Sequence, residues 1–543
     1  MRSIPLWLFA DRRGGDRRGR THLIVTGALA ALFLAVLVRT AWVCDDAFIT
    51  FRTVDNFLNG YGLRWNPAER VQSFTHPLWM FLYAVPYAVT GDPYVTSIWL
   101  SIVVSMLAFG LALWTVQDLW MAIAGAFLLL SSRAFVDYST SGLENPLTHL
   151  LLAVFATAWF RRDVRVFQAA LFVTGGLITL NRQDTLLLVL PGLIAVGVAV
   201  GVRRFVFLAL LGAVPVVVWE SFSLLYYGLL VPNTAFAKLN TGADSMELFR
   251  QGLTYPRDSL DRDPLVLPIT VAGGALAVVR RRAGALPLGA GILLYLSYVV
   301  IIGGDFMTGR FLAAPYFLAV LTLIRFRPTS RVMAPAVAAG VLAAAFAGYD
   351  KPVFASGRDF GVDDHIDAKI DRITGIADER RYYYPDTGYL RVSSRGGGGA
   401  TALHEWADTG RRYRHERRRV VVSGIIGFVG FYAGPDVHIV DCFALTDPLL
   451  ARLPAQPLWR IGHFMRRLPE GYLATLSDGG NRLVHPEIAA LYEDVRHVVA
   501  GPIWSVARFE SIWRLHRRSA NVNHEYEADR SACDVYLSER IPS

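Results

Sequence analysis

The sequence contains few charged residues for its length. Of its 543 residues only 18% are Asp, Glu, Lys or Arg, whereas 53% are hydrophobic. A soluble protein carries roughly a quarter charged residues, and apolar runs of about the length of membrane segments recur over most of this chain. The shortage of charge therefore excludes an ordinary soluble domain and predicts a polytopic α-helical membrane protein.

Cysteine is also scarce. The three cysteines, Cys44, Cys442 and Cys533, are too few for a disulfide framework. Cys442 and Cys533 could pair if both face an oxidising compartment, but their spacing leaves this open. Cys44 follows the first apolar run, where Trp42 and Val43 do not suit a lipoprotein cleavage site. Since no small-x-small site follows that run, an uncleaved membrane anchor is favoured.

The formal net charge of +9 does not indicate a nucleic-acid-binding protein. Many basic residues form short clusters between apolar runs, as they do in loops on the cytoplasmic face of a membrane. These clusters are the arm before Thr21 and residues 161–165, 203–204, 280–282 and 325–331. Loop charge therefore offers a way to orient the chain in the membrane.

The apolar runs lie near residues 22–43, 77–91, 94–114, 119–131, 146–160, 166–180, 185–202, 205–228, 264–279, 285–303, 311–324 and 332–348. Placing every basic cluster inside leaves 132–145, 181–184, 229–263, 303–310 and everything after about 349 outside. The number of crossings agrees with this placement if 77–91 is a re-entrant or surface-lying helix that does not cross the membrane, which its two prolines permit. We therefore expect about eleven transmembrane helices, with a cytoplasmic amino terminus and an extracytoplasmic carboxyl terminus.

Three regions are expected: a basic cytoplasmic arm (1–21), a transmembrane core (22–348) with a first external loop (44–76), and an extracytoplasmic domain (349–543). In the last region, residues 418–447 predict a strand, a glycine-rich turn, a helix and a strand, and thus an α/β domain. Gly424, Gly427 and Gly430 do not have the spacing of a dinucleotide fingerprint, so close strand–helix packing is favoured. Residues 393–400 are expected to form a flexible loop or linker.

The polar segments of the membrane half all fall on the predicted outer side. They are the stretch from Asp45 to His76 and residues 138–145, 181–184, 226–238 and 303–311. A transporter or flippase would place polar groups along helices near the membrane midplane, and a scaffold would need only its external domain. Polar groups at helix ends on one side favour a reaction at the outer membrane surface with a lipid-borne substrate.

Transfer from such a substrate needs a carboxylate to accept or orient a proton, and cations to stabilise a departing phosphate. Asp45 and Asp46 could supply the carboxylate, and aromatic residues such as Tyr61 and Trp65 could stack on a sugar. Cations are available at Arg52, His76, Arg182, Lys238 and Arg310. Each group also has a structural alternative: the acidic pair, Glu144 or Asp305 could cap a helix or turn, and Arg182 could lie at a membrane edge.

An acidic pair directly after the first transmembrane helix resembles the GT-C superfamily of membrane glycosyltransferases that use polyprenyl-phosphate sugars. More specifically, the chain resembles the terminal β-(1→2)-arabinofuranosyltransferase family of actinobacterial cell walls. The resemblance rests, in order, on DDAFITFRTVDNFLNGYGLRWNPAERVQSFTHPLW, SGLEN, NRQD, YYGLLVPNTAFAK, GGDFMTGRFLAAP and GIIGFVGFYAG with the residues up to GHFMRR. Gln183 in NRQD stands where relatives commonly have proline.

The resemblance implies an inverting transfer of a sugar, with arabinofuranose expected, from a polyprenyl-phosphate donor to a cell-envelope glycan such as arabinogalactan or lipoarabinomannan. The reaction would take place on the outer face of the bacterial cytoplasmic membrane. Asp45 would be the general base and Asp46 its partner. The donor phosphate would lie near Arg52, His76, Arg182, Lys238 and Arg310, and no cofactor would be required, although a divalent cation is left open.

Substrate contacts are expected from both parts of the chain. The predicted substrate-binding residues are Tyr61, Trp65, Glu144, Asn233, Asp305, Asp447 and His463. In the carboxyl-terminal domain, Trp406, Tyr432, His438 and Asp441 would join Asp447 and His463 in guiding the glycan.

Overall fold

The computed structural model describes residues 16–279, 284–325, 332–348, 353–355, 374–394, 404–457 and 459–517. Helices dominate, and each of the predicted apolar runs forms a helix, which confirms that part of the prediction. The helices of the first part are α1 (Asp16–Thr40), α2 (Asp45–Leu58), α3 (Pro77–Thr90), α4 (Pro93–Trp114), α5 (Leu119–Ser131), α6 (Arg133–Asp137), α7 (Asn145–Trp159), α8 (Arg165–Asn181), α9 (Leu186–Val200), α10 (Val202–Tyr226), α11 (Asn233–Leu239), α12 (Ser245–Arg262), α13 (Val266–Val279), α14 (Leu286–Ile301), α15 (Arg310–Leu323) and α16 (Met333–Gly348).

Within the described ranges, four helical segments are long and apolar enough to cross a membrane: Gly19–Thr40, Pro93–Trp114, Gln183–Val200 and Val202–Tyr226. Shorter apolar helices accompany them, among them α3, α5, α14 and α15. Together they make this a helical membrane protein. The number of crossings and the re-entrant role of α3 stay predictions.

Two stretches that the sequence presented as polar loops contain helices. The first half of the loop 44–76 is α2, and the stretch 229–263 contains α11 and α12. In α2, Ala47, Phe51 and Val54 are buried one turn or two turns apart, which is the spacing of one helix face. Burial of that face stabilises a helix although the segment is not apolar enough to be recognised as a membrane span. Residues 16–21 of the predicted basic arm likewise belong to α1.

The carboxyl-terminal part contains α17 (Glu379–Thr387), α18 (Tyr389–Ser394), α19 (Glu405–His415), β1 (Val420–Ser423), α20 (Phe428–Ala433), β2 (His438–Asp441), α21 (Tyr472–Asp478), α22 (Pro486–Val499) and α23 (Val506–Arg517). The strands β1 and β2 are parallel, with Val420 opposite His438 and Ser423 opposite Asp441. The strand–helix–strand prediction for 418–447 is therefore confirmed. Among the described residues this two-stranded pair is the whole sheet, so helices prevail here as well.

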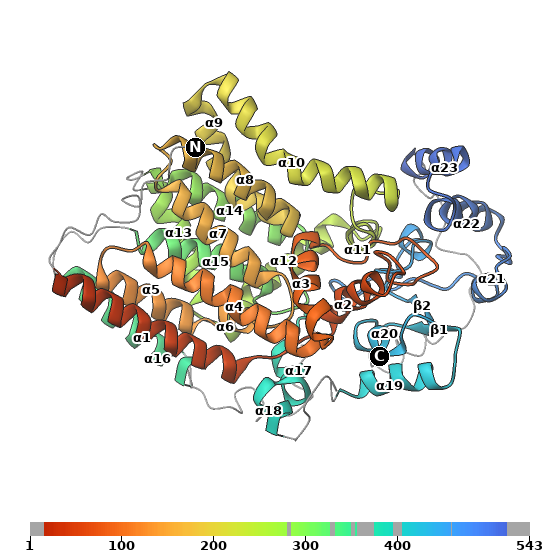
Figure 1. Cartoon of the computed structure of the whole chain (residues 1–543), viewed down its shortest axis with the longest axis horizontal. Coiled ribbons are helices and arrows are strands. Elements are labelled where there is room, and N and C mark those ends of the chain that lie inside the picture. The colour runs from red at the N-terminus through yellow and green to blue at the C-terminus, as the bar shows by residue number, and fades with distance from the viewer. Residues whose placement is uncertain are drawn as a thin grey trace.

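The two parts meet along α2, α3 and α11 (Figure 1). The apolar helices fill one side of the molecule, whereas α19 to α23 and the strands lie on the other, and α2 and α11 lie between them. Cys442 after β2 is disulfide-bonded, and Cys44 is buried and free. The sequence left open a pairing of Cys442 with Cys533. Cys533 lies outside the described residues, as do residues 395–400 of the predicted linker.

Candidate active site

The ends of four helices meet where the two parts of the chain join. α7 begins directly after Glu144, α8 ends directly before Arg182, α14 ends at Ile301 and α15 begins at Arg310. Gly304 turns the chain between α14 and α15 with a φ of 77°, a conformation that favours glycine. The polar stretches predicted to share one side of the membrane therefore do lie together.

These helix ends and α2 surround a cavity of about 490 Å³, a volume within the usual range for small-molecule sites. Its charged and polar lining includes Asp46, Thr50, His76, Glu144, Arg182, Asp184, Lys238, Asp305 and Arg310. Its apolar lining comes from α11, α12, α14 and the carboxyl-terminal part, through Leu239, Leu248, Ile301, Leu445, Ile461 and Phe464. The cavity lining thus combines charged and apolar side chains.

Glu144 forms ion pairs with two arginines of the cavity lining. It is buried, and its carboxylate lies 3.3 Å from Arg310 Nη2 and 3.5 Å from Arg182 Nη1. Arg182 is also held by Asp184, with Nε 2.8 Å from Oδ1. Burial alone would raise the pKa of Glu144, but the positive charges around it, led by Arg310, lower this pKa to about 2. Glu144 is therefore a permanent anion that fixes two guanidinium groups beside the cavity.

His76 lies next to this cluster as a neutral side chain. Its Nε2 is 2.8 Å from the Thr50 hydroxyl, and its Nδ1 is 3.4 Å from Glu144 Oε2. Burial lowers the pKa of His76 to about 4. With its proton on Nδ1, His76 donates toward Glu144 and accepts a hydrogen bond from Thr50.

Among the described residues, Lys238 is the lysine or arginine of the cavity lining that forms no ion pair with a carboxylate. Within the described ranges, its ammonium has no ion-pair partner within 4 Å, and its nearest aromatic contact places Nζ 5.7 Å from the Phe306 ring centre. Arg310 Nε is buried and likewise lacks a hydrogen-bond partner in the same part of the chain. Lys238 is thus available to an anionic ligand.

The acidic pair is divided between two environments. Consecutive residues of an α-helix point about 100° apart, so Asp45 and Asp46 at the start of α2 cannot face the same way. Asp46 lines the cavity, together with Ile49 and Thr50 one turn further along α2. Burial raises the pKa of Asp46 above its usual value, while Lys238 and Arg310 oppose that rise.

Asp45 faces away from the cavity, toward the carboxyl-terminal part. Its carboxylate accepts hydrogen bonds from the backbone N–H of Gly427 (3.0 Å) and of Phe428 (2.6 Å), at the start of α20. A Cβ at Gly427 would lie 1.9 Å from the Asp45 carbonyl oxygen, so this approach requires glycine. Burial raises the pKa of Asp45 to about 7 despite these bonds. The structure thus gives Asp45 a capping position and leaves Asp46 as the member of the acidic pair that lines the cavity.

Arg52 is also remote from the cavity lining. Its guanidinium donates to the carbonyl oxygens of Trp65 (2.8 Å), Gly430 (2.5 Å) and Val437 (2.9 Å), and lies over the Trp65 ring. Trp65 itself is fully buried. Both residues join the first loop to α20 and the turn before β2, so the structure does not support their predicted contacts with phosphate and sugar.

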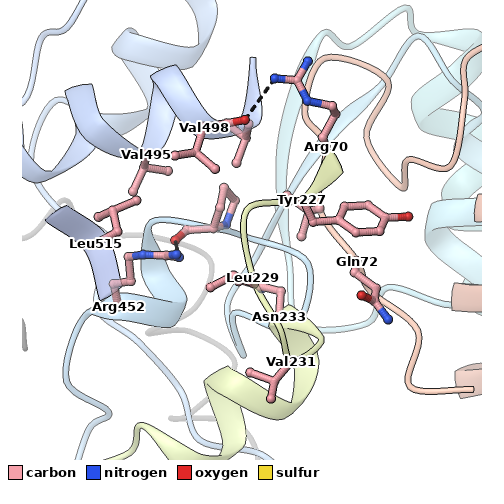
Figure 2. A pocket seen from close by; sticks show the side chains of 13 residues that line it. Arg70, Gln72, Tyr227, Leu229, Val231, Asn233, Arg452, Val495, Val498 and Leu515 are labelled. Carbon is pink, nitrogen blue, oxygen red and sulfur yellow. Dashed lines mark hydrogen bonds between the residues drawn. The ribbon is translucent and has the colours of Figure 1, made fainter. Parts of the chain in front are cut away.

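Beside the main cavity, a set of hydrogen bonds joins the first loop to α11 and to the carboxyl-terminal part (Figure 2). Arg70 in the first loop donates from Nη2 to the Val498 carbonyl of α22 over 2.9 Å. The Asn233 backbone N–H donates to the Gln72 carbonyl over 3.0 Å, and the Asn233 side chain donates to the Ala444 carbonyl over 2.9 Å. Asn233, predicted to bind substrate, therefore connects α11 to the first loop and to the segment after β2.

The other predicted substrate-binding residues of the carboxyl-terminal part do not line the cavity. Asp447 is buried and accepts hydrogen bonds from the Leu450 N–H (2.8 Å) and the Tyr472 hydroxyl (3.0 Å). His463 packs edge-on against aromatic rings, although its neighbours reach the cavity. Tyr61 in the first loop is 43% exposed and also lies elsewhere. Trp406, Tyr432, His438 and Asp441 are absent from the lining as well.

The cavity therefore gathers His76, Arg182, Lys238 and Arg310 from the predicted phosphate-binding set, and Glu144 and Asp305 from the predicted substrate-binding set. Thr50 was not predicted from the sequence to belong to the site, and Asp184 was given no role of its own. Thr50 could have been found from its spacing, because it follows Asp46 by four residues and shares its helix face once α2 is recognised as a helix. Asp184 stands two residues after Arg182 within the NRQD stretch.

The fold and the cavity define a helical membrane protein with a charged site at the ends of its apolar helices. No family model matches the chain. It is similar, however, to the protein named terminal β-(1→2)-arabinofuranosyltransferase of Mycobacterium tuberculosis, with 28% identity over 95% of both chains. A protein of the same name from Corynebacterium glutamicum is 29% identical over 56% of this chain and 51% of its own length. The resemblance to this family is thereby confirmed.

Proposed function

We propose that this chain is a membrane glycosyltransferase that transfers arabinofuranose from a polyprenyl-phosphate donor to a cell-envelope glycan on the outer face of the cytoplasmic membrane. The observation that carries the proposal is one cavity lined both by the carboxylate of Asp46 and by the cations Arg182, Lys238 and Arg310. The similarity to two arabinofuranosyltransferases over much or nearly all of the chain supports the choice of sugar.

The proposed reaction is inverting, and the cavity residues have distinct roles in it. An acceptor hydroxyl attacks the anomeric carbon and gives its proton to Asp46, while the bond from that carbon to the phosphate oxygen breaks. The polyprenyl phosphate leaves with the bonding electrons, and Lys238, Arg310 and Arg182 stabilise its charge. The raised pKa of Asp46 brings this carboxylate closer to the working range of a general base.

Asp45 supports the base in this scheme by holding α20 against the start of α2. This changes the roles expected from the sequence, in which Asp45 was the base. The glycan acceptor enters from the side of Leu445, Ile461 and Phe464, where the carboxyl-terminal part reaches the cavity. The scheme uses no metal ion, and the effect of a divalent cation on transfer can be tested directly.

Two further features support the proposed topology of about eleven crossings with an external carboxyl-terminal part. The polar stretches placed outside by loop charge line one cavity. Cys442 is disulfide-bonded, and disulfides form and persist mainly in oxidising compartments.

A transfer assay tests the proposal. The purified protein in nanodiscs is given a synthetic polyprenyl-phosphate arabinofuranose donor and an oligoarabinoside acceptor, and the product linkage is determined. We expect one added arabinofuranose in β-(1→2) linkage. No transfer from this donor or from a panel of other polyprenyl-phosphate sugars, with the labelled lipid moving between leaflets instead, would contradict a transferase and indicate a flippase.

A further inference from the structure

The outer face of α23 carries exposed apolar side chains although it points away from the protein, and Glu510, paired with Arg514 over 3.6 Å, borders them. Val506, Phe509 and Trp513 are 74%, 44% and 60% exposed, and their spacing places them on one face of the helix. Trp504, two residues before the helix, is 76% exposed. Phe509 and Trp513 thus place two large aromatic rings on one face of the helix, and Trp504 lies close to its start. Single exposed apolar side chains are normal on a protein surface, but a group of this kind needs an explanation.

The inner face of α23 attaches this helix to the end of α10. Arg508 donates from Nη2 to the Tyr226 carbonyl over 3.1 Å, and from Nε to the Val498 carbonyl of α22 over 3.0 Å. A Cβ at Gly228 would lie 3.2 Å from Cγ1 of Ile512, which shows how closely α23 approaches the residues after α10. Because Tyr226 is the last residue of α10, α23 lies beside the end of that helix (Figure 1).

α10 carries an exposed apolar surface that leads toward α23. It is among the four segments able to cross a membrane, and Leu210, Val214 and Val218 along it are 65%, 55% and 64% exposed. Such side chains on a membrane-crossing helix face lipid. Leu230, in the loop that follows α10, is a further 49% exposed. Exposed apolar side chains are thus found on α10, in the loop after its end and on the neighbouring α23.

We propose that α23 is an interfacial helix that rests on the membrane leaflet at the end of α10, with Val506, Phe509 and Trp513 inserted among the lipid headgroups and upper acyl chains. Tryptophan is enriched at this depth, and amphipathic helices with aromatic and basic residues bind there. Arg517 lies over the Trp513 ring, 4.1 Å from its centre, and contributes a positive charge at the level of the lipid phosphates. The contact anchors the carboxyl-terminal part beside the cavity and does not depend on the reaction proposed above.

Site-specific fluorescence in lipid nanodiscs tests this contact. An environment-sensitive NBD label is attached at Trp513→Cys, with Val217→Cys on α10 as the lipid-facing control and Asp408→Cys on α19 as the water-facing control. The native protein, treated with the same reagent, gives the background from its own cysteines. We expect a blue-shifted emission at position 513 and loss of most of it when the nanodisc lipids carry a nitroxide on the upper acyl chain, as at position 217.

Three results would overturn the proposal. A label at 513 that behaves like the label at 408 would place α23 in water. A blue shift without nitroxide quenching that disappears on deleting residues 518–543 would show that this segment covers the face. A blue shift accompanied by self-quenching between labelled molecules would indicate a second copy. A label at Phe509→Cys gives an independent reading on the same face should the 513 variant fail to fold.

Discussion

Replacing Glu144 with glutamine removes the anion that holds Arg310 and Arg182 at the cavity. Lowering the carboxyl pKa from 4.5 to about 2 corresponds to about 3 kcal/mol of net stabilisation of the charged form, after the surrounding charges have offset the effect of burial. Loss of one partner from a buried ion pair costs roughly 3–5 kcal/mol. Because Arg182 keeps Asp184 at 2.8 Å and Arg310 keeps Asp305 at 3.9 Å, we expect the lower end, about 3 kcal/mol.

The loss is measured as a change in thermal unfolding of the purified protein in nanodiscs, followed by intrinsic fluorescence. We expect Glu144→Gln to lower the unfolding temperature by several degrees, and to weaken donor binding because two guanidinium groups lose their fixed positions. Glu493→Gln on α22, which breaks an exposed pair with Arg496, is the matched control and should change the unfolding temperature little.

The pH dependence of the protein's stability provides a second test of this prediction. The folded-state pKa of Glu144 lies below its unfolded value of 4.5, so the stabilisation is fully present above that value and is lost as the pH falls toward 2. The difference between native protein and Glu144→Gln should therefore be constant from pH 6 to pH 8. A variant as stable as the native protein and with native donor affinity would refute the proposed role of Glu144.

Three further substitutions separate binding from structure. Lys238→Met should weaken the binding of a polyprenyl-phosphate donor by roughly tenfold to a hundredfold, measured by titration at constant acceptor, and an unchanged affinity would exclude Lys238 as a phosphate ligand. Arg52→Lys should lower the unfolding temperature, because hydrogen bonds to three carbonyl groups are lost, and should leave the donor affinity of the folded protein unchanged. A loss of donor affinity without a loss of stability would show that Arg52 binds the donor. The pKa of His76 is lowered to about 4, so its contribution to stability is present above about 6.5 and lost as the pH falls to about 4. His76→Gln should therefore differ from the native protein more at pH 7.5 than at pH 4.5, and an equal difference at both pH values would contradict a neutral, buried imidazole.

The apolar helices and the side on which their polar ends gather were predictable from the sequence. Both follow from local patterns, since apolar runs set the helices and loop charge sets their alternation. That is why Arg182, Lys238 and Arg310, far apart in the sequence, could be assigned to one site.

The direction of individual side chains in the first loop was not predictable in the same way. Assigning Asp45 as the base treated the acidic pair as part of a loop, in which neither residue has a fixed direction. Once this segment forms α2, the helix geometry separates Asp45 from Asp46 by about 100°. The side that each one faces is then decided by α20, nearly 400 residues later in the chain, whose N–H groups bind Asp45.

Arg52 and Trp65 illustrate the same limit. An arginine and an aromatic residue in an external loop have the composition of a phosphate and sugar site. In the structure Arg52 donates to backbone carbonyl groups of the carboxyl-terminal part, and the Trp65 ring packs against its guanidinium. No local pattern shows that those carbonyl groups will lie opposite Arg52. Long-range packing therefore decides which of several suitable residues reach the cavity.

The most direct test of the account compares transfer by Asp46→Asn and Asp45→Asn under identical conditions, at saturating donor and acceptor, with each protein shown to be folded. The account predicts that Asp46→Asn loses transfer while keeping donor affinity, because the base is absent and the cations remain. Asp45→Asn should keep measurable transfer with reduced stability, because it weakens only the contact with α20. Full loss in folded Asp45→Asn, together with retained transfer in Asp46→Asn, would contradict the central claim that Asp46 is the base.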